Sequence, residues 1–256
     1  MNASYRSLSP QECKILANSL GDKPETVIHT HLLYRNLAHA YIEGTPENFS
    51  CAIIQSLLDP EEPIAFGDDP ELIWQILRSV PEWQCVSVIP ECAESLSKIM
   101  IQKMGQSIRP YGDVYHALYD PAQTFHHIAV RQLTKDDHRL LENCPEELST
   151  FGYENLGIAL KEGIIVGGIV EGELVSVAHT SARANRHSDI GIHTLEAWRN
   201  QGIATAAASL TAQLVQACNQ IPVWSTGEDN YASLRIAQKI GFAEVQRRIY
   251  LISRRS

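Results

Sequence analysis

The pattern of hydrophobic and polar positions is clearest in the second half of the chain. Ile190, Ile192 and Thr194 alternate with other residues as in a half-buried strand. After a short loop, apolar residues recur at helical spacing on one face, at Ile203, Ala207, Leu210, Leu214 and Ala217. Neighbouring alanines raise the helix propensity of this segment. The pattern therefore predicts a strand that ends at Thr194, a loop, and a helix that starts at Ile203.

The rest of the second half alternates between strand-like and helix-like patterns. Strands are predicted at residues 125–133, 164–170, 173–181, 221–226 and 246–252, and helices near 135–148, at 153–162 and from Asn230 onward. Gly172 and Glu173, which follow Glu171, are typical of a tight hairpin turn. The order is β-α-α-β-β-β-α-β-α-β, which predicts an α+β fold built on a mixed α/β sheet.

The first half gives a weaker version of the same series. Helices are predicted at residues 9–19, 24–43, 70–80 and 91–104, and strands at 49–58, 83–89 and 114–119. Asp120-Pro121 is a plausible boundary, because a residue that precedes proline leaves the helical region. We therefore expect two domains, at residues 1–121 and 122–256.

The loop before the helix at Ile203 carries candidate chemistry. It reads Arg199-Asn-Gln-Gly202-Ile-Ala204, an Arg-x-x-Gly-x-Ala pattern. The glycine allows backbone to approach a ligand closely, and the unpaired N–H groups of a helix N-terminus favour a bound phosphate. The alternative is an ordinary strand-loop-helix connection with a turn glycine. A second motif follows downstream, where Asn230 starts a helix that ends at Gly241-Phe242.

These two motifs, in this order and separated by one helix and one strand, resemble the GNAT superfamily of acyl-CoA-dependent N-acyltransferases over residues 125–251. The resemblance implies a sheet that splits where the strand ending at Thr194 leaves the strand ending at Thr226. The first half resembles the degenerate N-terminal half of two-domain members such as glycine N-acyltransferase-like enzymes. Asn230 and Gly241 also fit a helix N-cap and a C-terminal glycine, and both roles can hold together.

The resemblance also implies that acetyl-CoA or another acyl-CoA is the co-substrate. Backbone N–H groups of the loop would bind its pyrophosphate, and the strand would pair with the amides of its pantetheine arm. The residues expected to contact it are Ile192, Thr194, Arg199, Asn200, Gln201, Gly202, Ile203, Ala204, Thr205, Asn230 and Ser233. For Arg199, a surface cation near a helix start is an equally good interpretation.

The sequence departs from the commonest family pattern in its catalytic groups. Many members have a tyrosine seven residues after the asparagine as general acid, where this chain has Ala237. Asp189 and His193 share one face of the strand and are the candidate bases. The pKa of histidine suits a base at neutral pH, whereas Asp189 needs burial or a relaying water. We expect acyl transfer to the amine of a small molecule; the alternative is a non-catalytic acyl-CoA-binding regulatory module.

Composition narrows the partners and the compartment. A net charge of −9 and a pI near 5.6 argue against nucleic acid and anionic membranes as partners. The six cysteines have no Cys-x-x-Cys spacing and lie in apolar runs, which favours reduced thiols and a cytoplasmic location. His29/His31 and His126/His127 lack metal-ligand spacing, so no metal is expected. No export or membrane signal is visible, and the sequence is compatible with a homodimer.

Overall fold

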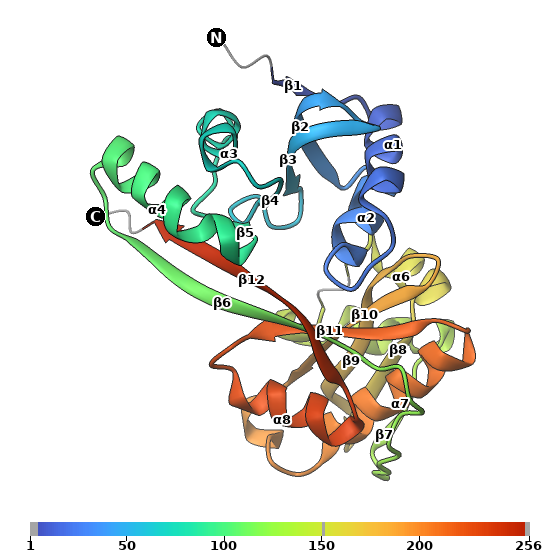
Figure 1. The fold of residues 1–256 in the computed structure, drawn as a ribbon. Helices are drawn as coiled ribbons and strands as arrows, with labels where there is room; N and C mark the ends of the chain where they lie inside the picture. Colours follow the sequence, from blue (N-terminus) through green and yellow to red (C-terminus); the bar gives the residue numbers. More distant parts are fainter. Residues whose placement is uncertain (1–4, 150–151, 254–256) are drawn as a thin grey trace. The chain divides into compact units, whose positions relative to one another are not determined.

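The computed structural model describes residues 5–149 and 152–253 of the chain (Figure 1). These residues form two compact units that are discontinuous in sequence. The first contains residues up to Gly21, His29–Val114 and the residues from Gln246 onward; the second contains Asp22–Ile28 and Tyr115–Val245. The division into continuous domains at residues 1–121 and 122–256 stays a prediction.

The first unit is built on a mixed sheet in the order β1-β2-β3-β4-β5-β12. Neighbouring strands are antiparallel except β4 and β5, which are parallel. Its elements are β1 (Arg6–Ser7), α1 (Pro10–Leu20), most of α2 (Val27–Tyr34), β2 (Ala38–Thr45), β3 (Asn48–Ser56), β4 (Ile64–Phe66), α3 (Pro70–Leu77), β5 (Cys85–Val88), α4 (Pro90–Met104), and parts of β6 (Ile108–Ala117) and β12 (Ala243–Ser253).

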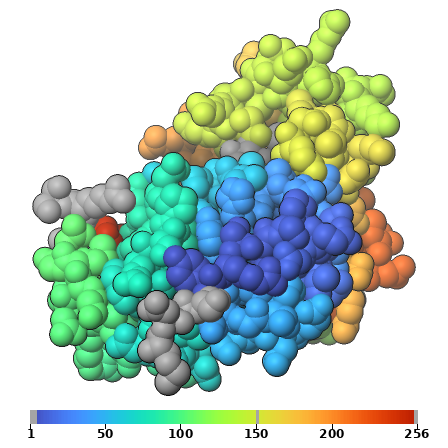
Figure 2. All heavy atoms as spheres, turned by 90° about the horizontal axis from the view of Figure 1, so that it is seen from above, coloured from blue at the N-terminus to red at the C-terminus, as the bar shows by residue number. Residues whose placement is uncertain are grey.

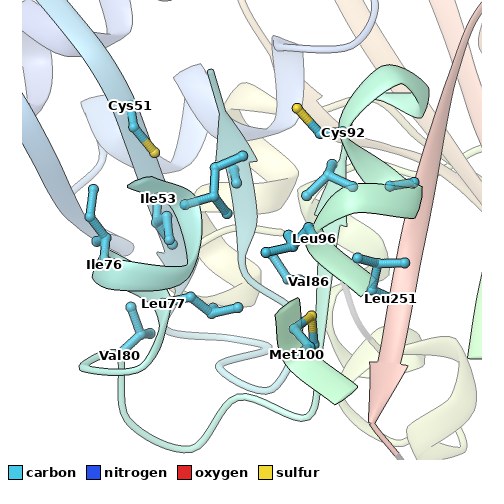
Figure 3. Close-up of a cluster of buried hydrophobic side chains, with 14 residues drawn as sticks. Cys51, Ile53, Ile76, Leu77, Val80, Val86, Cys92, Leu96, Met100 and Leu251 are labelled. Atoms are coloured by element: carbon cyan, nitrogen blue, oxygen red, sulfur yellow. The ribbon is translucent and has the colours of Figure 1, made fainter. Parts of the chain in front are cut away.

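The core of the first unit lies between its strands and the helices α3 and α4. Figure 3 shows Ile76 and Leu77 of α3 and Leu96 of α4 together with Ile53 and Val86 of the strands. Each of these side chains is fully buried, and burial of an aliphatic side chain stabilises a fold by about 1.5–3 kcal/mol. Helix α1, dark blue in Figure 2, lies at the surface of this unit.

The second unit repeats the series of elements of the first. Its sheet has the order β6-β11-β10-β9-β8-β7. β10 and β11 are parallel, and each neighbouring pair from β7 to β10 is antiparallel. Its elements are β7 (Val130–Gln132), α5 (His138–Glu142), α6 (Leu156–Glu162), β8 (Ile165–Val170), β9 (Glu173–Arg183), β10 (His187–Thr194), α7 (Ile203–Ala217), β11 (Ile221–Gly227), α8 (Tyr231–Ile240), and parts of β6 and β12. The predicted mixed α/β sheet is confirmed.

The last strand of each series is exchanged between the units. β12 follows α8 in sequence, but its residues from Gln246 onward belong to the first unit, where they pair antiparallel with β5. The end of β6, which follows α4, belongs to the second unit and is the neighbour of β11. The chain therefore passes from one unit to the other within these two strands.

Helices α7 and α8 pack on the same face of the second unit's sheet. Ala208 and Ala212 of α7 and Ile240 of α8 join Ile190 and Trp224 of the strands in one buried cluster. The small alanine side chains let α7 lie close to the sheet. This packing fixes the N-terminus of α7 beside the end of β10.

The predicted helix at residues 24–43 is wrong. α2 ends at Tyr34, Asn36 adopts a left-handed φ of 58°, and β2 begins at Ala38. Ala38, Ala40 and Ile42 point to the core with period two, a pattern that overlaps with helical spacing over so few residues. The strand predicted at residues 125–133 is confined to Val130–Gln132, and the preceding segment instead lies along α7, where the backbone N–H of Phe125 donates to Ser209 Oγ.

Candidate acyl-CoA site

The parallel pair β10 and β11 separates partway along its length. The two strands pair at His187↔Ile221, Ser188↔Pro222 and Asp189↔Val223, and within the described residues no further pair follows. β10 continues to Thr194, paired with β9 alone, while β11 continues to Gly227. Residues Ile190–Thr194 of β10 and 224–227 of β11 thus do not pair with each other. We call this stretch the β10–β11 split. The predicted split of the sheet is confirmed.

The loop that follows β10 is held against the end of that strand. The side chain of Arg199 donates from Nε to the backbone oxygen of Thr194 at 3.1 Å. Asn200 and Gly202 have left-handed φ values of 63° and 86°. A Cβ on Gly202 would have no atom within 4 Å, so the backbone there faces open space. The loop thus turns the chain tightly into α7 and leaves room directly in front of its first turn.

The N-terminus of α7 has no cap from a side chain. Gly202 is the N-cap residue, and the backbone N–H groups of Ile203, Ala204 and Thr205 have no acceptor within the described part of the chain. Such N–H groups, with the positive end of the helix dipole, bind anions. The open space and the unused donors fit a diphosphate. An extended, amide-containing group could lie along the free edge of β10, which has the polar groups for strand-like pairing.

Asn230 and Ser233 lie where β11 meets α8. The side-chain oxygen of Asn230 accepts from the backbone N–H of Ser233 at 3.2 Å, so Asn230 caps α8. Ser233 Oγ accepts from Trp224 Nε1 at 2.9 Å. Trp224 is the first residue of β11 beyond its last pair with β10, so this contact places Ser233 near the base of the split. Their role in binding acyl-CoA stays a prediction.

Asp189 and His193, the two candidate bases, lie on one face of β10 but far apart. The register shift beside Asp189 adds an extra residue to β9, Ser181, and leaves the alternation of β10 intact. Four residues of strand separate the two side chains by about 13 Å. Asp189 is 5% exposed at the base of the split and accepts a hydrogen bond from Ser181 Oγ. His193 is half-exposed, with Nε2 3.2 Å from Glu147 Oε2.

His179 is a titratable neighbour that the sequence did not single out. It lies on β9 directly opposite Gly191, and a Cβ on Gly191 would come within 3.0 Å of its ring. Burial lowers the pKa of His179 to about 4, so its imidazole is neutral at pH 7. In the sequence, His179 follows Val175 and Val177 with the period of two that is typical of a strand. This pattern is the one signal that could have indicated that His179 lies beside the split.

Across residues 5–149 and 152–253, no group of three or more His, Cys, Asp or Glu side chains is arranged to hold a metal ion. Over the same ranges, no helix is long and apolar enough to cross a membrane.

The fold and this site together have the arrangement that the sequence motifs predict: a mixed sheet with a split parallel pair, followed by a glycine loop and an uncapped helix. Residues 81–250 match the family described as GNAT acetyltransferase. The match covers about two thirds of the chain, and the protein belongs to this family. GNAT enzymes use acetyl-CoA as co-substrate.

Solved structures share the fold over nearly the full length. A GCN5-related N-acetyltransferase-like protein from Streptococcus suis is 17% identical, with a TM-score of 0.68 over 95% of this chain and 99% of that one. A GNAT-family acetyltransferase from Colwellia psychrerythraea is 13% identical, with a TM-score of 0.60 over 98% and 100%. A tandem GNAT protein from the clavulanic acid biosynthesis pathway is 10% identical, with a TM-score of 0.57 over 97% of each chain. No curated protein matches the chain.

Proposed function

We propose that the protein transfers an acetyl or other short acyl group from acyl-CoA to the amino group of a small molecule. The observation that carries this proposal is the β10–β11 split, which leads directly to the uncapped N-terminus of α7. A free strand edge and a set of unused N–H donors, joined by the segment 195–202, suit a ligand with an amide-containing arm and a diphosphate.

In this proposal the chain holds acyl-CoA mainly through its backbone. N–H groups of residues 201–205 bind the pyrophosphate, and Gly202 gives it room. Backbone groups of Ile192 and Thr194 pair with the amides of the arm. Arg199 acts by fixing the loop to the end of β10, since its Nε is bonded to Thr194. Bound acyl-CoA supplies a thioester that an amine can attack.

The direction of the arm favours Asp189 over His193 as the base. The anion-binding end lies after Thr194, so an arm along β10 runs back towards Asp189 and brings the acyl group to the base of the split. His193 is near the anion-binding end instead. In this arrangement Asp189 takes the proton of the attacking amine, directly or through a water molecule. Neutral His179, opposite Gly191, lies between these two positions.

A small cationic amine is the acceptor class that the charge of the chain favours. The net charge of −9 raises the local concentration of cations.

All six cysteines are free thiols, and burial raises the pKa of Cys51 and Cys85 to about 12, which makes them unreactive. These thiols support a reducing compartment such as the cytoplasm as the place of action.

A non-catalytic acyl-CoA-binding module is the second candidate function. The position after Asn230 where many GNAT enzymes have a tyrosine is Ala237 of α8, which is fully buried in the cluster that α8 shares with α7 and the sheet. No side chain at that position can donate a proton to a departing thiolate. Because a thiolate leaves without obligatory protonation, this feature is compatible with catalysis but also with binding alone.

Thiol release separates the two candidates. The protein is incubated with acetyl-CoA and a panel of small amines, and free CoA thiol is followed against a reaction without amine. Release that depends on one or more amines supports the transferase. Tight binding of acetyl-CoA without release on any amine favours the module, and absence of binding contradicts both.

A further inference from the structure

The first unit contains a counterpart of the β10–β11 split. In the part of the chain that the structure describes, its parallel strands β4 and β5 pair at a single position, Ile64↔Ser87. β4 then leads through a short loop into α3. In the second unit β10 leads in the same way into α7. Both units therefore have a parallel pair that separates early, followed by a helix whose N-terminus lies at the end of the first strand of that pair.

An arginine of the same chain occupies the position between β4 and β5. Arg248 is 2% exposed, and its Nη2 donates to the backbone oxygens of Ala65 on β4 at 2.6 Å and Ser87 on β5 at 3.1 Å. Its Nε donates to Ser87 Oγ at 3.0 Å, and its guanidinium carbon lies 5.1 Å from the ring centroid of Phe66. The guanidinium thus bridges the two strand edges where their own pairing stops.

The N-terminus of α3 is likewise filled from within the chain. Asp69 is the N-cap, and its Oδ1 accepts from the N–H groups of Glu71 at 3.0 Å and Leu72 at 3.2 Å. Pro70, at the first helical position, has no N–H to offer. Asp68 and Glu71 add negative charge nearby. These donors are therefore used and the surrounding charge repels anions, in contrast to α7, where Gly202 leaves the corresponding donors open.

We propose that the first unit is a self-occupied counterpart of the acyl-CoA site, with the Arg248 guanidinium between the strands and the Asp69 carboxylate at the helix N-terminus. Each chain consequently binds a single acyl-CoA, in the second unit. The inference rests on the proposed function for the location of that one site. The Asp69 carboxylate and the Arg248 guanidinium lie far apart in sequence, and the exchanged strand β12 brings the arginine into the first unit.

Isothermal titration calorimetry with CoA tests the inference through its stoichiometry. We expect one CoA per chain in the unmodified protein. In Gly202→Asp, which places a carboxylate at the N-terminus of α7, we expect that one site to remain with a Kd raised by roughly 30- to 150-fold relative to the uncharged Gly202→Asn. Two CoA per chain in the unmodified protein would show a usable site in the first unit and overturn the inference without touching the proposed function. One CoA per chain whose affinity is equal in Gly202→Asp and Gly202→Asn would place that CoA away from the N-terminus of α7 and overturn the inference as well. No binding by the unmodified chain would instead overturn the proposed function, and the single-site stoichiometry with it.

A second variant tests Arg248 directly. Arg248→Gln removes the charge, and we expect CoA affinity to stay within about twofold with one site per chain, while Tm falls by several degrees because carbonyl oxygens lose a charged donor. Loss of CoA binding in a folded Arg248→Gln protein would place this arginine in the acyl-CoA site and overturn the inference. If Arg248→Gln does not fold, Asp69→Asn, which keeps an N-cap acceptor, is held to the same binding criterion.

Discussion

Replacement of Gly202 by aspartate should separate ligand binding from folding. Gly202 has a left-handed φ of 86°, and a Cβ there would meet no atom within 4 Å. Asparagine and aspartate tolerate this backbone region better than other side chains, so each substitution should cost about 1 kcal/mol of stability or less. Gly202→Asn is the matched control, because it adds nearly the same atoms without the charge.

The binding penalty follows from charge. A carboxylate about 5 Å from one negative charge of the pyrophosphate, at an effective dielectric constant between roughly 20 and 40, costs about 2–3 kcal/mol. This corresponds to a Kd for CoA raised by roughly 30- to 150-fold in Gly202→Asp relative to Gly202→Asn.

Calorimetry at two salt concentrations checks the size and the origin of this effect. A higher salt concentration should reduce the difference in CoA affinity between Gly202→Asp and Gly202→Asn, because the site is exposed and its charges are screened. Equal CoA affinity in Gly202→Asp and Gly202→Asn, with both proteins folded, would refute the placement of the pyrophosphate at this helix N-terminus.

Three further predictions follow from the same structure. Asp189→Asn should lower the turnover number by roughly 100-fold or more with CoA affinity nearly unchanged, whereas His193→Ala should have a small effect on turnover; the reverse order in steady-state kinetics would identify His193 as the base. Because burial holds the pKa of His179 near 4 in the folded state, against about 6.5 unfolded, the unfolded chain binds more protons between these values. The free energy of unfolding should therefore decrease as pH falls from about 6.5 to about 4, and urea titrations of His179→Gln should show a shallower decrease. The same pH dependence in both proteins would contradict the low pKa of His179. Asp22→Ala removes the acceptor for the backbone N–H of Arg186 and the partner of His187 Nδ1, which lies 2.7 Å from Asp22 Oδ1. The free energy of unfolding should fall by about 1–3 kcal/mol with an unchanged m-value in urea. The fall should be smaller in Asp22→Asn, which keeps an acceptor oxygen.

The core of the candidate site could be predicted because its signals are local. The strand ending at Thr194, the left-handed glycine and the helix starting at Ile203 are all specified by neighbouring residues, and the structure has them at these positions. The hairpin turn at Glu171-Gly172 is equally local, and both residues have the left-handed φ values that such a turn requires.

Features that depend on distant residues could not be predicted. β4 has only three residues, too few for a periodic pattern, and its partner β5 lies about twenty positions further on. The exchange of β6 and β12 depends on the strand edge with which each one pairs in the folded chain. The local residue pattern of β6 or of β12 does not specify that partner strand. The local pattern around Arg248 does not predict its burial between β4 and β5, because both strands lie far from it in sequence.

The sequence placed Asp189 and His193 on one face of the strand but could not distinguish their roles. That distinction needs the position of the last β10–β11 pair, at Asp189↔Val223, because this pair defines the base of the split. The partners Ser181 and Glu147 come from other elements and are equally invisible in the local pattern.

A crystal structure of the protein with bound CoA tests the central claim most directly. We predict the pyrophosphate against the backbone N–H groups of residues 201–205, the pantetheine arm along Ile190–Thr194, and the thiol at the base of the split near Asp189. CoA bound elsewhere, or an arm that leaves the free edge of β10 uncovered, would contradict the account.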